Sequence, residues 1–213
     1  MSNNSVSRWS LMKQNKRQLQ KENTRNLILK TAYQVYSDLG FGATTNMIAK
    51  EAKISHGSVF LHFPTVEDLQ VCLLEQFGSE ISNQLHELSE QNNTLEQILY
   101  AHLDTLIKHE KFYGRLISDS SRLPLQSQYV YISIQSAVSI HLNQVIEKKQ
   151  KEGLIKTLPM HFIFNSWIGL IHYYLMNQRL FAPEGSVLSR YKEELVHNFV
   201  KLLSTKGVEN ESI

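Results

Sequence analysis

The chain has 213 residues, of which 42% are apolar and 20% are charged, and it contains nine glycines, four prolines and one cysteine. This composition predicts a folded globular protein rich in long helices, and it excludes a disordered chain, an intramolecular disulfide and a Cys-rich metal site. Residues 1–71 hold nine Lys and Arg against five Asp and Glu, whereas residues 72–213 hold 13 against 15. Positive charge is therefore concentrated in the N-terminal third, where a phosphate backbone could use it.

The N-terminal residues and the most apolar segment both bear on the location of the protein. Residues 1–26 are polar and basic and contain no apolar segment typical of a signal peptide. The most apolar stretch, residues 162–176, is shorter than the roughly 20 residues that a membrane helix needs. We therefore expect a cytoplasmic protein, in which the lone Cys72 is a small core residue kept reduced.

Residues 1–23 are predicted to form a basic, flexible arm before the first helix, although the second half of the arm could extend that helix. The basic residues of this arm are Arg8, Lys13, Lys16, Arg17 and Lys21. The arm could contact the minor groove or neighbouring phosphates of DNA, or it could be a solvated tail without a role.

Residues 24–70 are predicted to form three helices. Apolar residues at helical spacing indicate a first helix that ends at Gly40. Hydroxyl caps at residues 44–45 and at Ser55 then begin two short helices, separated by a turn at residues 53–55. This is the layout of a helix-turn-helix motif, whose second helix enters the major groove of DNA.

The rest of the chain, residues 71–205, is predicted to form a second helical domain for ligand binding and dimerisation, followed by a tail at residues 206–213. No alternating strand pattern is present, so the expected fold is all-α with about nine helices. The last two helices, residues 159–181 and 186–205, are too apolar for one exposed face. We expect them to form the two-fold interface of a homodimer as a four-helix bundle.

Residues 55–63 carry the strongest functional signal in the sequence. They read Ser-His-Gly-Ser-Val-Phe-Leu-His-Phe, and Gly57 lowers helix propensity by about 1 kcal/mol relative to Ala. Core packing gives no reason for such a small, polar start. A helix N-terminus without bulk can approach DNA closely and direct its free N–H groups toward phosphates or base edges.

A spaced set of residues between positions 25 and 69 carries a family resemblance. These residues are Arg25, Ile28, Ala32, Tyr36, Gly40, Phe41, Thr44, Thr45, Ile48, Ala49, Ala52, Ile54, Ser55, Gly57, Val59, Phe60, His62, Phe63, Glu67 and Leu69. In this pattern the segment resembles the DNA-binding domain of the TetR (tetracycline repressor) family of bacterial regulators. The resemblance covers about a fifth of the chain, and the remainder agrees with the family in length and helical character.

The resemblance implies DNA-contacting roles for nine residues. Thr44 and Thr45 would bind backbone phosphate, Ser55, His56, Gly57 and Ser58 would enter the major groove, and Phe60, Leu61 and His62 would flank the groove and its phosphates. Two positions depart from the family pattern, which often has an aromatic residue where Leu61 stands and a lysine where Val66 stands. The missing lysine removes one expected phosphate contact.

Several of these residues also have a purely structural interpretation. The two threonines are helix caps first, and phosphate binding is a second use of the same geometry. His62 could be a packed histidine at the end of a short helix, and His56 an exposed histidine without a role. Phe60 could belong to the core.

Aromatic and histidine side chains of the second domain are candidates for a ligand pocket. They are His102, Phe112, Tyr113, Tyr129, Trp167 and Tyr173, and their mixed character suggests a partly apolar small molecule. The same residues could equally form an ordinary core. His102 and His109 lie seven residues apart on one helix face without a further ligand, so we expect no metal site and no cofactor.

Together these features predict a ligand-responsive, DNA-binding transcriptional regulator. It would act as a homodimer on a palindromic double-stranded operator, as a repressor that a small molecule releases; an activator, or a DNA-binding dimer without an inducer, is the alternative. An enzyme is disfavoured, and no catalytic residues are expected, because no nucleophile elbow, phosphate loop or metal-ligand spacing occurs. A protein-interaction domain would not need the small, polar start of residues 55–58, and a DNA-binding unit alone would not need about 140 further residues.

Overall fold

A computed structural model describes residues 3–90 and 93–205, with the backbone alone for residues 3–14 and 90. The elements are α1 (Asn3–Leu39), α2 (Thr45–Glu51), α3 (His56–His62), α4 (Val66–Glu90), α5 (Leu95–Lys108), α6 (Glu110–Asp119), the 3-10 turn η1 (Ser120–Arg122), α7 (Leu125–Lys151), α8 (Met160–Met176), α9 (Gln178–Phe181) and α10 (Val187–Leu203). The predicted all-α fold is confirmed, with ten α-helices in the described residues rather than nine. The predicted tail at residues 206–213 lies outside them.

The first helix is longer than the sequence predicted. α1 comprises 37 residues and begins at Asn3, so residues 3–23 belong to this helix and do not form a separate arm. This segment contains no Gly or Pro and is rich in Lys, Arg, Gln and Leu, which are good helix formers. The hydroxyl of Thr24 donates to the carbonyl of Gln20 at 2.9 Å, so Thr24 lies within the helix and does not cap its start.

The end of α1 is fixed by Gly40 and Asp119. Gly40 has a φ of +85°, and a Cβ at this position would lie 2.7 Å from Oδ2 of Asp119. Any other residue would therefore be strained and would clash. The same carboxylate oxygen accepts from the backbone N–H of Phe41 at 2.8 Å. The loop after α1 is thereby attached to the end of α6.

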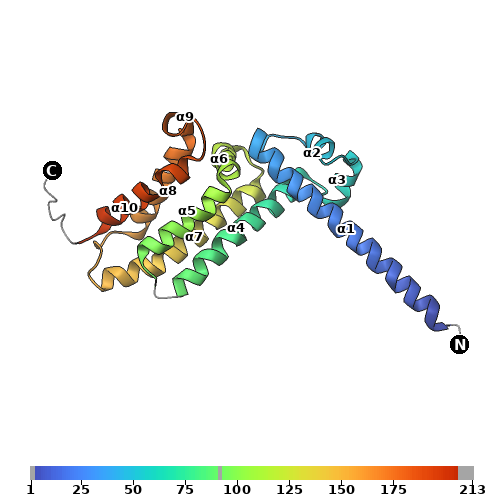
Figure 1. The fold of residues 1–213 in the computed structure, drawn as a ribbon, viewed down its shortest axis with the longest axis horizontal. Helices are drawn as coiled ribbons and strands as arrows, with labels where there is room; N and C mark the ends of the chain where they lie inside the picture. Colours follow the sequence, from blue (N-terminus) through green and yellow to red (C-terminus); the bar gives the residue numbers. More distant parts are fainter. Residues whose placement is uncertain (1–2, 91–92, 206–213) are drawn as a thin grey trace.

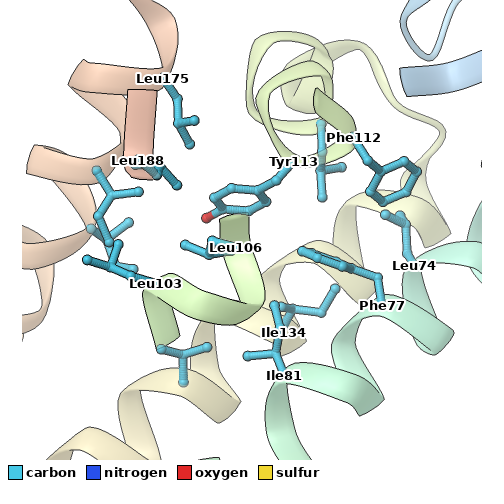
Figure 2. Close-up of a cluster of buried hydrophobic side chains, with 14 of the residues drawn as sticks. Leu74, Phe77, Ile81, Leu103, Leu106, Phe112, Tyr113, Ile134, Leu175 and Leu188 are labelled. Atoms are coloured by element: carbon cyan, nitrogen blue, oxygen red, sulfur yellow. The ribbon is translucent and has the colours of Figure 1, made fainter. Parts of the chain in front are cut away.

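The second domain has one continuous apolar core. Figure 2 shows side chains from six helices meeting there: Leu74, Phe77 and Ile81 of α4, Leu103 and Leu106 of α5, Phe112 and Tyr113 of α6, Ile134 of α7, Leu175 of α8 and Leu188 of α10. Helices α4 and α7 pack closely, because a Cβ on Gly78 would lie 2.6 Å from Cγ1 of Ile134. Within the described residues, no helix is long and apolar enough to cross a membrane.

The N-terminal helices α1 to α3 and the second domain are joined through α4 and α6. In Figure 1, α1 to α3 lie at one end of the molecule and α8 to α10 at the other, with α4 to α7 between them. The side chain of Gln70 donates to the carbonyl of Phe41 at 3.1 Å, and the carboxylate of Glu67 accepts from the N–H of Gln126 at 2.8 Å. Helix α4 is thus bonded both to the loop after α1 and to the start of α7.

Candidate nucleic-acid interface and regulatory core

Local signals define the two short helices of the predicted helix-turn-helix. The hydroxyl of Thr44 accepts from the N–H of Met47, and that of Ser55 accepts from the N–H of Ser58 at 3.2 Å. Between the helices, Lys53 has a φ of 56°, and the N–H of Ile54 returns to the carbonyl of Ala49 at 3.0 Å. The predicted turn and both predicted caps are therefore present.

The two adjacent threonines have different environments. Thr44 is exposed, whereas Thr45 is buried and its hydroxyl lies 2.9 Å from Nε2 of His56. This contact ties the first turn of α2 to the first turn of α3. The Thr45 hydroxyl already has a partner inside the protein, so Thr44 is the threonine with a freely accessible side chain.

The outer face of α3 is accessible along its whole length. Ser55, His56, Gly57, Phe60 and Leu61 are exposed, and Ser58 and His62 are partly exposed. Val59 and Phe63 point inward and are buried. Leu61 is 81% exposed, and no packing within the chain explains an apolar side chain there. Phe60 meets the edge of the His56 ring, with centroids 4.6 Å apart.

The C-terminal end of α3 is attached to α1 through Arg25. Its Nη1 donates to the carbonyl of His62 at 3.3 Å, and its guanidinium lies 4.3 Å from the centre of the Phe63 ring. The pKa of His62 is lowered, mainly because the ring is partly buried. The positive charges of Lys21 and Arg25 lower it further. The sequence pattern included Arg25 but did not indicate this bracing role.

The six predicted pocket residues divide between the interior and the surface. His102, Phe112, Tyr113 and Trp167 are buried in the second domain, whereas Tyr129 and Tyr173 are 53% and 57% exposed. The last two therefore do not line the interior of the protomer. They lie on helices α7 and α8, which carry apolar side chains on their outer faces as well, so their spacing alone could not show which way they point.

Three of the buried members, His102, Trp167 and Tyr113, make hydrogen bonds that the sequence did not reveal. Nε1 of Trp167 donates to Nδ1 of His102 at 3.0 Å, and the Tyr113 hydroxyl lies 2.8 Å from Nε2 of His172 and accepts from Nε2 of Gln135 at 3.0 Å. Burial lowers the pKa of both histidines to about 4, and for His102 the nearby His172 contributes further. Both rings are thus neutral, as buried hydrogen-bonding groups should be.

Three cavities lie where α1 meets the second domain. The first, of about 380 Å³, is bounded by α1, α4 and His109. The others, of about 610 and 530 Å³, lie between the end of α1, α6 and the α8–α9 corner. Phe112 is the one predicted pocket residue that lines any of these three. Among the described residues, no group of three or more His, Cys, Asp and Glu side chains could hold a metal ion.

Comparison with known proteins agrees with this architecture. Residues 28–70 match the sequence model described as "Bacterial regulatory proteins, tetR family". The chain is 22% identical over 145 residues to YuxN of Bacillus subtilis, an uncharacterized HTH-type transcriptional regulator; the match covers 64% of this chain and half the length of YuxN.

Solved structures with the same fold include TetR-family regulators and other bacterial regulators. PfmR of Thermus thermophilus superposes with a TM-score of 0.70 at 14% identity, over 86% of this chain and 99% of PfmR. MbdR of Azoarcus gives a TM-score of 0.70 at 17% identity, over 83% and 97%. FadR of Bacillus subtilis, solved in complex with stearoyl-CoA, gives 0.67 at 15% identity, over 82% and 96%. Residues 28–70 thus match the DNA-binding segment of the TetR family of bacterial regulators, and the described chain as a whole has the fold of solved TetR-family regulators.

Proposed function

We propose that this protein is a ligand-responsive transcriptional repressor that binds a palindromic operator as a homodimer and is released by a small molecule. The accessible, side-chain-poor start of α3 is the observation that carries the proposal. Gly57 is exposed, and a Cβ there would meet nothing closer than 4.0 Å, so the glycine is not needed for packing. A glycine at this position instead allows DNA to approach the helix backbone closely.

In this proposal the residues of α2 and α3 divide into two groups. Thr44 contacts phosphate, because its hydroxyl is exposed at the start of α2. Thr45 holds His56 in position and contributes to DNA binding through that ring. Ser55, His56, Gly57 and Ser58 face base edges, and Phe60, Leu61 and His62 flank the groove.

The homodimer is proposed to form through the outer face of α8 together with α10. Phe162, Tyr173 and Met176 are more than half exposed on α8, and Gly169 between them has open space above it. Such a stripe suits close packing against the same helix of a second copy. Leu195 and Phe199, which share one apolar face of α10, are buried within the protomer. They therefore pack in the core of the protomer and do not contact the second copy directly.

The ligand is proposed to act on α4 and α6, which connect the second domain to α1. The mixed apolar and polar lining of the network around Tyr113 suits a partly apolar small molecule with hydrogen-bonding groups. FadR, which shares the fold, holds stearoyl-CoA, and this supports an organic ligand here. A shift of α4 would move α3 and change the spacing of the two recognition helices, so repression relieved by ligand is favoured over activation.

Selection from a random pool of duplexes tests the operator proposal. The purified full chain should enrich an inverted repeat whose half-site centres lie one or more helical turns apart, roughly 34–36 Å each. Enrichment of a single, unrepeated site would contradict the dimeric arrangement. No enrichment at all would contradict the proposed function.

A further inference from the structure

The N-terminal part of α1 extends as a helix beyond the domain that it stabilises. Among the described side chains of α1, which begin at residue 15, Ile28 is the first buried one, and residues 15–23 are all exposed. From Asn3 to Asn23 the helix spans roughly 30 Å. Figure 1 shows this part of α1 running past α3 and away from every other helix. Core packing therefore does not account for it.

A basic stripe runs along one side of this extension and ends against α3. Arg17, Lys21 and Arg25 follow one another at intervals of four residues, which places them on one slowly turning face of the helix. Glu22 is the acidic residue in this stretch, and its carboxylate accepts from Nε2 of Gln18 at 2.8 Å. Arg25 has partners inside the protein, so the charges of Arg17 and Lys21 are the ones left to act on an outside partner.

Arg25 fixes the direction in which the stripe faces. Its guanidinium bonds to the carbonyl of His62 and lies over the ring of Phe63, so this side of α1 adjoins the C-terminal end of α3. The charge of Lys21, one turn earlier, contributes to the lowered pKa of His62. The stripe thus ends beside α3, the helix that is proposed to enter the major groove.

We propose that Arg17 and Lys21 give α1 a second, rigid contact with the operator, in which they bind duplex phosphates beside the site that α3 occupies. This inference rests on the proposed function, because it places the DNA on the exposed face of α3. The partner is double-stranded DNA rather than an acidic protein, since the stripe continues directly from that face and phosphate charge complements it. This phosphate contact does not depend on the base sequence; it adds affinity and orients the duplex.

Neutralising the stripe tests the contact with phosphates. We compare wild type, the double variant R17Q/K21Q and the control K30Q. The control removes an exposed positive charge on the opposite face of the same helix from Lys21. For the double variant, the slope of log K against log salt should become shallower by up to about 1.8, and binding near 0.15 M salt should weaken on the order of tenfold. Operator and scrambled duplexes should weaken by the same factor, and K30Q should match wild type.

A proline tests whether the extension must be a rigid helix. Asn23→Pro interrupts the helix ahead of its packed part but keeps every charge, and Asn23→Ala is the matched control. The proline variant should lose the same affinity as R17Q/K21Q, with circular dichroism and thermal unfolding showing that the domains stay folded. A mobile arm would instead tolerate the proline.

The outcomes separate this inference from the function on which it rests. If wild type and R17Q/K21Q bound the operator with equal affinities and equal salt slopes, the proposed phosphate contact of α1 would be overturned. The operator proposal would remain intact. Wild-type affinity of Asn23→Pro would overturn the rigid helix. Failure of wild type to bind any duplex at low salt would reject the proposed function itself.

Discussion

The hydroxyl of Tyr33 lies 2.7 Å from Nδ1 of His109 and joins α1 to the corner between α5 and α6. On the other side of the imidazole, Nε2 lies 3.0 Å from a carboxylate oxygen of Glu80 on α4. A proton on Nε2 lets the ring donate to Glu80 while it accepts from Tyr33. One histidine therefore links the DNA-binding domain to two helices of the second domain.

Removing the Tyr33 hydroxyl should weaken this junction without disturbing its packing. Tyr33→Phe keeps the stacking on Phe112, whose ring centre lies 4.6 Å away, and should lower the free energy of unfolding by about 1 kcal/mol. Urea titrations of Tyr33→Phe, His109→Phe and the double variant should give an interaction energy of at least about 0.5 kcal/mol. Tyr129→Phe, at an exposed tyrosine of α7, is the control. Additive effects of the two substitutions would contradict the link.

The buried His102 and the partly buried His172 should make stability depend on pH. Burial lowers the pKa of His102 and His172 to about 4 from 6.5, so the unfolded chain binds protons at a higher pH than the folded chain does. The free energy of unfolding should therefore fall as the pH drops from about 6.5 toward 4, by roughly 1–3 kcal/mol for each histidine, and this contribution should be constant above pH 7.

A substitution identifies which histidine causes the dependence. His102→Gln can still accept from Trp167, and it should make the fall between pH 6.5 and 5 shallower. His197→Gln, at an exposed position of α10, should leave the profile unchanged. If both variants gave the wild-type profile, His102 would not carry this proton linkage.

Charge on the outer face of α8 should dissociate the dimer. Tyr173→Glu places a carboxylate at the centre of the proposed interface, where it would be buried without a partner. Sedimentation velocity at micromolar concentration should then show a folded monomer, whereas Tyr129→Glu, equally exposed on α7, should remain a dimer. Leu195→Asp should unfold the protomer, because Leu195 is buried within it. If Tyr173→Glu remained a dimer, the interface would have to lie on another surface.

Substitutions in α2 and α3 should separate base recognition from phosphate binding. Ser58→Ala or His56→Ala should change the preferred base at one operator position, with a difference of roughly 1–3 kcal/mol. Thr44→Val should weaken all duplexes by a similar factor, because a phosphate contact carries no sequence information. Selections that returned one operator for wild type and for both α3 variants would contradict the assignment.

The helix-turn-helix could be predicted from the sequence because its signals are local. The caps at Thr44 and Ser55 and the small start of α3 each lie within a few residues of the feature that they determine. The start of the first helix was placed too late because its prediction relied on the apolar repeat that begins at Ile28. Residues 3–23 are polar and lack this repeat, yet α1 already begins at Asn3.

The interior of the second domain could be predicted only in part. Burial of His102 and Trp167 follows from their positions on apolar helix faces. The partners His172 and Gln135 come from other helices, and no spacing along one chain brings them to Tyr113. The exposure of Tyr173 escaped prediction because α8 is apolar on both its inner and outer faces.

Whether α3 reads a specific operator is tested by the affinity for a selected operator relative to that for a scrambled duplex of the same length and composition. The full chain and both duplexes should be compared by equilibrium titration at about 0.15 M salt, where non-specific phosphate binding is weak. We predict that the operator binds at least about 10³-fold more tightly, and that this ratio falls in Ser58→Ala. Equal affinities for the two duplexes would contradict the conclusion that α3 reads a specific operator.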